Sequence, residues 1–263
     1  MVTETSTKIA ARHPGISEDA ILGGRLTLGQ PLRGHRFGHD AILLAAATPA
    51  QAGERAVELG AGVGAAGLAL AWRVAGLDVS LVEIDPALTA LSQENAKRNG
   101  LAARVRSVCL DVAVPLSAYV AAGLLPGSSD QVLMNPPFNP PQNASPDRGR
   151  RMARTASDET LSAWLRAAAW LLRSSGVVTF IWRADGLADV LTALAADFGA
   201  ISLLPIHPKP GIAAIRVLAR AKKGSGGPVS LLPGFVLADA DGRPSADAEA
   251  VLRDGAVLPF PES

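Results

Sequence analysis

The residues best suited to chemistry are Asn135, Pro136, Pro137 and Phe138, which follow an apolar strand expected over 131–134. Neither proline can donate to a sheet ladder, so the strand must end at Asn135. The Asn135 amide oxygen and the carbonyls beside the prolines are acceptors without local N–H partners, and Phe138 adds a flat face. Such a turn suits a planar NH2 group, because two acceptors on its hydrogens free the nitrogen lone pair while the ring stacks. The alternative is a turn that only closes the strand.

A glycine-rich turn at Gly60–Gly64 lies between a strand expected over 55–59 and a helix over 65–75. Glycine at alternate positions lets the backbone turn sharply and approach a ligand, and the helix N-terminus adds unpaired N–H groups. The next strand, 78–82, leads to Glu83, nineteen positions after the last glycine. A doubly wound fold places a carboxylate there on the two hydroxyls of a ribose. The alternative is a glycine-rich turn and a surface glutamate.

The composition of the chain excludes several classes of protein. The 263 residues are 48% hydrophobic and 19% charged, enough for a substantial core, and the net charge of +1 points to no partner. The single cysteine, Cys109, excludes an intramolecular disulfide framework and a cysteine zinc cluster, and its apolar neighbours predict a buried thiol on a strand. The apolar runs are too short to span a bilayer, so a soluble, cytoplasmic protein is expected.

Helices and strands alternate along the chain, which predicts an α/β fold. The last two strands are joined by a loop too short for a crossover helix, so the final strand should be antiparallel. Asp40 stands before the first helix, as its N-cap or as a ligand contact. Residues 139–157 should be irregular, with Ser157 capping the next helix. Expected helices cover 41–47, 65–75, 87–99, 115–122, 158–173 and 187–198; expected strands are an arm at 23–30, then 55–59, 78–82, 104–109, 131–134, 177–182, 201–206 and 213–219.

Four arginines, Arg148, Arg150, Arg151 and Arg154, come soon after the proline turn. Arginines beside a base-binding turn would meet phosphates, whereas a charged run elsewhere is usually a solvated loop. Possible second contacts are Lys209, Lys222 and Lys223. The histidines show no metal-ligand spacing, and we expect no metal.

By these motifs the chain resembles class I S-adenosylmethionine-dependent methyltransferases. Over most of its length it is similar to the bacterial tRNA (valine) adenine-N6 methyltransferase family, which modifies the adenine next to the anticodon. The stretches that carry the resemblance are Arg36–Leu44, Glu58–Gly64, Glu83, Asp111, the Asn-Pro-Pro-Phe (NPPF) motif, and parts of 207–224.

The resemblance implies a single Rossmann-like domain over 18–222, with a seven-stranded, mostly parallel sheet whose last strand is antiparallel. A flexible lead covers 1–17, and an extension over 223–263 packs on the same domain. The catalytic turn is Asn135–Phe138. Cofactor contacts are expected at Phe37, Gly38, Asp40, Glu58, Gly60, Ala61, Gly62, Gly64, Glu83, Ile84, Asp111, Val112 and Asn135; RNA contacts are expected at the four arginines and Lys209.

The expected reaction is direct displacement of the cofactor's methyl group by the amine of an adenine in tRNA. The sulfonium is already an activated leaving group, so Glu83 and Asp111 are assigned to binding and not to catalysis. The alternatives are methylation of a protein side-chain amide or a small molecule, and a cofactor-binding module without activity. An oxidoreductase would prefer Gly-x-Gly-x-x-Gly and would leave the NPPF turn without a role. The oligomeric state stays open, a homodimer included.

Overall fold

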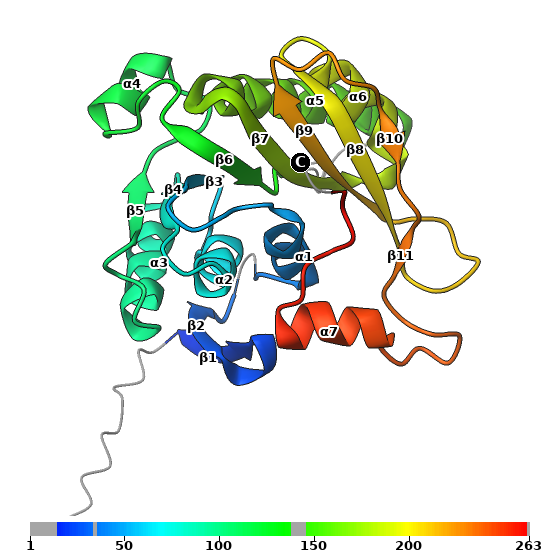
Figure 1. Ribbon diagram of the computed structural model, residues 1–263, viewed down its shortest axis with the longest axis horizontal. Helices are drawn as coiled ribbons and strands as arrows, with labels where there is room; N and C mark the ends of the chain where they lie inside the picture. Colours follow the sequence, from blue (N-terminus) through cyan, green and yellow to red (C-terminus); the bar gives the residue numbers. More distant parts are fainter. Residues whose placement is uncertain (1–14, 34–35, 138–145, 262–263) are drawn as a thin grey trace, which may run out of the picture.

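The computed structural model describes residues 15–33, 36–137 and 146–261, with the backbone alone over 146–158. Most of the predicted lead and Phe138 lie outside these residues. A hairpin of β1 (Ile16–Ile21) and β2 (Leu26–Pro31), with the short 3-10 turn η1 (Leu22–Gly24) between them, precedes the main sheet (Figure 1). The main strands are β3 (Arg55–Leu59), β4 (Asp78–Glu83), β5 (Val105–Cys109), β6 (Ser129–Met134), β7 (Leu172–Arg183), β8 (Phe198–His207) and β9 (Arg216–Lys223).

Helices cover both faces of this sheet. Figure 1 shows α1, α2 and α3 on one side and α5 and α6 on the other. Their order along the chain is α1 (His39–Ala47), α2 (Ala65–Arg73), α3 (Pro86–Arg98), α4 (Leu116–Ala121), α5 (Pro146–Leu171), η2 (Ala184–Gly186), α6 (Leu187–Leu194) and α7 (Ala246–Asp254). The predicted α/β class is confirmed.

The sheet has the order β10-β8-β9-β7-β6-β3-β4-β5. Strands β3 to β7 are parallel, and β9 is antiparallel to both β7 and β8, as the short loop predicts. The seven predicted strands are present. Two short strands, β10 (Ser230–Leu231) and β11 (Phe235–Val236), add to β8, so the predicted C-terminal extension covers the sheet edge.

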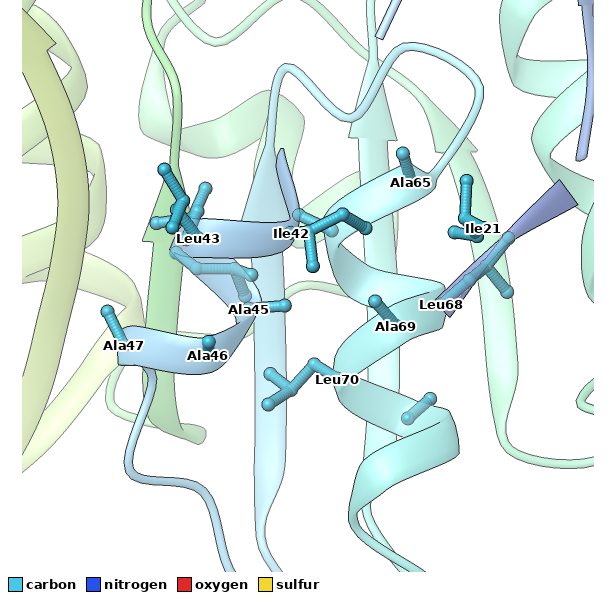
Figure 2. Packing of buried hydrophobic residues seen from close by; sticks show 14 of the residues in the cluster. Ile21, Ile42, Leu43, Ala45, Ala46, Ala47, Ala65, Leu68, Ala69 and Leu70 are labelled. Carbon is cyan, nitrogen blue, oxygen red and sulfur yellow. The ribbon is translucent and has the colours of Figure 1, made fainter. Parts of the chain in front are cut away.

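One part of the core lies between α1, α2 and the sheet. Figure 2 shows Ile42, Leu43 and Ala45 of α1 near Leu68, Ala69 and Leu70 of α2. Of these, Leu43, Leu68 and Leu70 are at most 1% exposed. Burying one such side chain contributes about 1.5–3 kcal/mol. Alanines fill most of the other buried positions of both helices, which lets the helices and the sheet approach closely.

Three predictions about local structure are wrong, and one of two alternatives is excluded. Helix α5 begins at Pro146 and continues through the stretch 146–157 that was expected to be irregular, so Ser157 does not start it. The C-terminal extension, in which no helix was expected, contains α7, capped by the Ser245 hydroxyl, which accepts a hydrogen bond from the Ala248 N–H at 3.0 Å. The N-cap of α1 is Gly38, which excludes the N-cap alternative for Asp40. Cys109 is exposed, because it ends β5, the strand at the edge of the sheet.

The tail also contacts the N-terminal hairpin. The Arg25 guanidinium donates to the Arg253 carbonyl at 2.5 Å and lies 3.5 Å from the Asp254 carboxylate, so α7 packs beside η1. Within the described ranges, every helix is too short or too polar to cross a membrane.

Candidate functional site

The predicted motifs meet at one edge of the sheet. The chain forms β3, β4 and β5 in outward order and then returns to place β6 on the other side of β3. Open α/β sheets bind ligands at such a switch point, outside the carboxyl ends of the strands. Register pairs Leu59 of β3 with Met134 and with Val82, so Asn135, Gly60 and Glu83 follow on adjacent strand ends. With a strand spacing of 4.7–4.9 Å, Asn135 and the end of β5 lie about 14 Å apart.

The glycine turn leaves one open face. Gly60 has φ +68°, and a side chain there would collide with the Trp164 ring of α5. Gly62 has φ +55°, and a Cβ there would meet nothing within 4 Å. Ala61 donates its N–H to the Val82 carbonyl at 2.9 Å, which anchors the turn to β4. Gly64, at φ +85°, is the N-cap of α2. The turn is therefore fixed on one side and accessible at Gly62.

Glu83 lies directly against this turn. Its side chain is buried, and its Oε2 accepts the Gly62 N–H at 2.7 Å while Oε1 accepts the Asp85 N–H at 2.9 Å. A carboxylate oxygen has more than one acceptor position, so both can also take ribose hydroxyls. Asp85 itself caps α3, since its Oδ1 accepts from Ala87 at 2.7 Å. The next residue after Glu83, Ile84, is 60% exposed and offers an apolar face to a flat ligand ring.

Asp111 and Val112 follow β5 at the far end of this edge. Asp111 Oδ1 accepts the Ala113 N–H at 2.8 Å, and Val112 is buried. The Tyr119 hydroxyl donates to the Val112 carbonyl at 2.8 Å. Burial, and then the charge of Asp111, raise the pKa of Tyr119, which keeps its phenol protonated as the donor. The turn that carries Asp111 is therefore held in place from inside the protein.

Glu58, predicted to contact the cofactor, points behind the turn. It is 5% exposed, and its Oε2 accepts the Gly67 N–H of α2 at 2.7 Å. Burial, partly offset by this hydrogen bond, raises the pKa of Glu58 to about 8, and the charge of Glu83 adds to the rise. Glu58 is therefore mostly protonated at neutral pH. Its geometry supports the packing of α2 on β3, and Glu83 is the carboxylate that faces the turn.

Asn135 is half-buried at the end of β6, with Pro136 buried and Pro137 exposed. The Asn135 Oδ1 atom is buried and accepts no hydrogen bond from the described part of the chain. A buried acceptor without a partner is uncommon, because its desolvation is not compensated. Within the described residues, no protein donor would therefore compete with a ligand for this acceptor. The prediction for Phe138 falls outside the described residues.

The segment before α1 is tied to the same edge. Asp40 Oδ2 accepts the Arg216 Nε–H at 3.0 Å, and Arg216 begins β9 opposite Arg183, the last residue of β7. Phe37 is partly buried against the core, and Gly38 is exposed. The ion pair brings the start of α1 to the strand ends. Phe37 and Gly38 directly precede this point, and their contacts with a ligand remain proposals.

The predicted basic contacts divide between two edges. Lys209 lies in the β8–β9 connection, at the same edge as Asn135, whereas Lys222 and Lys223 end β9 at the opposite edge. Side chains of Arg148, Arg150, Arg151 and Arg154 fall outside those that the structure describes. Among the described residues, no three His, Cys, Asp or Glu side chains form a group that could hold a metal ion.

Sequence reasoning missed Asn95, a fully buried residue of α3. Its Nδ2 donates to the Val63 carbonyl at 3.0 Å and to the Gly29 carbonyl at 2.9 Å, and its Oδ1 accepts the Gly29 N–H at 2.7 Å. One amide thus joins the glycine turn to the N-terminal hairpin. The sequence signal that could have indicated a buried role for Asn95 is its position on the same helix face as Leu88 and Leu91. Trp164 of α5 covers Gly60 in the same turn.

Comparison with known proteins places this geometry in a family. Residues 36–205 match the model of the methyltransferase small domain. A tRNA1(Val) (adenine(37)-N6)-methyltransferase of Bacteroides thetaiotaomicron is 29% identical over 179 residues, which cover 67% of this chain and 72% of that protein. A release factor glutamine methyltransferase of Chlorobaculum tepidum is 29% identical over 161 residues, covering 58% and 53%.

A solved structure is also similar. The crystal structure of a predicted O-methyltransferase from Agrobacterium tumefaciens superposes with a TM-score of 0.71, at 26% identity, over 83% of this chain and 98% of that one. The open face at Gly62, the Glu83 carboxylate and the apolar Ile84 surface suit the methionine, ribose and adenine parts of S-adenosylmethionine, in that order. The chain belongs to the methyltransferase small domain family and is an S-adenosylmethionine-dependent methyltransferase.

Proposed function

We propose that this enzyme methylates the exocyclic amine of an adenine in tRNA. The observation that carries the proposal is the buried Asn135 Oδ1, an acceptor without a partner in the described residues, one strand from the glycine turn. An adenine N6 amine is planar and carries two hydrogens, so it can donate one to Asn135. The relative from Bacteroides thetaiotaomicron, named for an adenine-N6 activity on a tRNA, supports this choice of acceptor.

The roles of the residues follow from their positions. S-adenosylmethionine, when bound, supplies an activated methyl group on sulfur. Glu83 would hold the ribose hydroxyls, and Asp111 would accept a hydrogen bond from the cofactor's adenine amine. Asn135 would accept an N–H of the target amine, which reduces conjugation of the nitrogen lone pair with its ring. No side chain is assigned as a general base, because a methylated ammonium-like nitrogen loses its proton readily.

A second candidate substrate is a protein glutamine amide. A primary amide is also a planar NH2 group, so Asn135 could receive it in the same way. The relative from Chlorobaculum tepidum, named a release factor glutamine methyltransferase, favours this alternative. The turn reads one NH2 group and cannot by itself distinguish the two substrates.

Incubation with radiolabelled S-adenosylmethionine separates these candidates. We expect label in tRNA and little in release factors or in a small-molecule extract. Label found only in protein would show that the substrate is a protein amide and not an adenine of tRNA. A tRNA substrate would also place the reaction in the cytoplasm.

Affinity for tRNA should depend on salt if arginines bind its phosphates. Replacing Arg148, Arg150, Arg151 and Arg154 with Gln should flatten the log–log dependence of tRNA affinity on salt by about 0.7–0.9 for each phosphate that the variant no longer neutralises. Cofactor binding, measured by calorimetry, should be unchanged. An unchanged dependence of tRNA affinity on salt would show that these arginines do not bind the RNA phosphates.

A further inference from the structure

A cavity of about 600 Å³ lies at the edge of the sheet opposite Asn135. Its lining includes Asp130 at the start of β6, and the five strand steps from Asp130 to Asn135 correspond to about 17 Å. Other lining residues come from the end of α1, from β9 and from the C-terminal segment; they include Thr48, Arg73, Arg220, Lys222 and Phe260. The cavity is therefore separate from the methyltransferase site.

Two arginines in this cavity point at the end of α1, where Figure 2 labels Ala45 and Ala47. Arg73 Nη2 donates to the carbonyls of Ala45 at 2.8 Å and Thr48 at 2.7 Å. Arg220 Nη2 donates to the Ala47 carbonyl. The Arg220 guanidinium also lies over the Phe260 ring, 4.2 Å from its centroid. Both guanidinium groups are therefore fixed within one helical turn of each other.

Among the described residues, no carboxylate pairs with either of these two arginines. In the described residues, neither Arg73 nor Arg220 has an acidic oxygen within 4.0 Å, and both Nε atoms are buried without a hydrogen-bond partner. The C-terminus of a helix offers roughly half a negative charge, against two full positive charges here. The free carbonyls at the end of α1 accept hydrogen bonds from both arginines but do not neutralise their combined charge.

The arginines nevertheless remain charged at neutral pH. Burial lowers the pKa of Arg73, and burial together with the charge of Arg73 lowers the pKa of Arg220 to about 10. The two acids that line the cavity have other donors. Asp130 accepts from Arg173 and from the Arg55 N–H, and Glu54 accepts from the Gln131 amide at 3.0 Å. Lys222 adds a further positive group to the lining.

We propose that this cavity is a second ligand site, which binds a phosphate group of a small molecule, either inorganic phosphate or a phosphomonoester. A phosphate in the cavity can accept hydrogen bonds from the guanidinium groups and the Lys222 ammonium that line it, and its charge offsets the pair of arginines. The cavity has room for more than a phosphate, so a small organic group attached to it would also fit.

Titration of the full chain with inorganic phosphate, read by calorimetry, tests the site. Chloride at matched ionic strength is the reference. We expect saturable phosphate binding by the wild type, weakened about tenfold or more in Arg220→Gln, since one charge-assisted partner is removed. Arg25→Gln is the matched control, because Arg25 also donates to backbone carbonyls and lies near an aromatic ring but outside the cavity. Lys222→Gln, a second change in the lining of the cavity, provides another variant should Arg220→Gln fail to fold.

Two results would overturn the proposal: a wild type that binds phosphate no better than chloride, or variants of Arg220 and Lys222 that both keep wild-type affinity. A tRNA titration distinguishes the source of the phosphate. For a small-molecule site, Arg220→Gln leaves tRNA affinity unchanged. If the group belongs to the RNA backbone, the same variant weakens tRNA binding, phosphate competes with tRNA, and the small-molecule assignment is replaced.

Discussion

Replacing Glu58 with Gln should change how the stability of the protein depends on pH. Glu58 is buried behind the glycine turn, where its pKa rises from 4.5 to about 8. In the unfolded chain it loses its proton near the ordinary value, whereas the folded protein keeps the proton until about pH 8. The free energy that Glu58 contributes is therefore fully present below pH 4.5 and is lost progressively as the pH rises to about 8.

The magnitude follows from the two pKa values. They differ by about 3.5 units, and each unit corresponds to 1.36 kcal/mol, so the full loss is about 5 kcal/mol as an upper bound. We expect about 3–5 kcal/mol. Gln has the shape of the protonated acid and can accept the Gly67 N–H in the same way, but it does not ionise.

Urea unfolding of wild type and Glu58→Gln from pH 5 to 8.5 measures this difference. The free energy of unfolding of the variant, relative to wild type, should rise with pH across that range. Glu249→Gln on the exposed face of α7 controls for the loss of an acid as such, because its ion pair with Arg253 is exposed. Parallel pH profiles for wild type and Glu58→Gln would refute the inference that Glu58 is protonated in the folded enzyme.

Three further changes test the site. Glu83→Ala should weaken S-adenosylmethionine binding by about 1.5–3 kcal/mol in calorimetry, because charge-assisted hydrogen bonds to ribose are removed. The control variant Asp85→Asn, which can still cap α3, should bind S-adenosylmethionine as tightly as the wild type does. Asn95→Ala leaves Gly29 and the Val63 carbonyl without partners and should lower the free energy of unfolding by about 2–4 kcal/mol, while an unchanged urea midpoint would contradict its bridging role. Asn135→Ala should reduce turnover by roughly 100-fold or more with cofactor affinity intact. A retained rate would mean that Asn135 only closes the strand.

The sequence predicted those features that depend on local patterning. Apolar strands, the glycine turn and the residue that follows each strand defined the sheet, and parallel strands must bring their carboxyl ends to one edge. Asn135, Gly62 and Glu83 therefore came together as expected. The antiparallel direction of β9 followed in the same way from a loop too short for a helix.

What the sequence could not predict depends on contacts between distant segments. The role of Asn95 requires the hairpin residue Gly29, and the orientation of Asp40 requires Arg216, 176 positions away. The start of α5 was missed because Pro, Asn, Gly and Arg are common in loops, although Pro is also favoured in the first turn of a helix. Exposure of Cys109 depends on β5 being the edge strand, which single-strand hydrophobicity does not reveal.

Identification of the product nucleoside tests the central claim most directly. Total tRNA lacking this modification is incubated with the wild-type enzyme and S-adenosylmethionine carrying a deuterated methyl group, digested to nucleosides and analysed by mass spectrometry. We expect N6-methyladenosine that carries the heavy methyl group. Heavy methyl groups absent from all nucleosides, or present only on oxygen or carbon atoms, would contradict it, because the NPPF turn would then not be acting on an exocyclic amine of RNA.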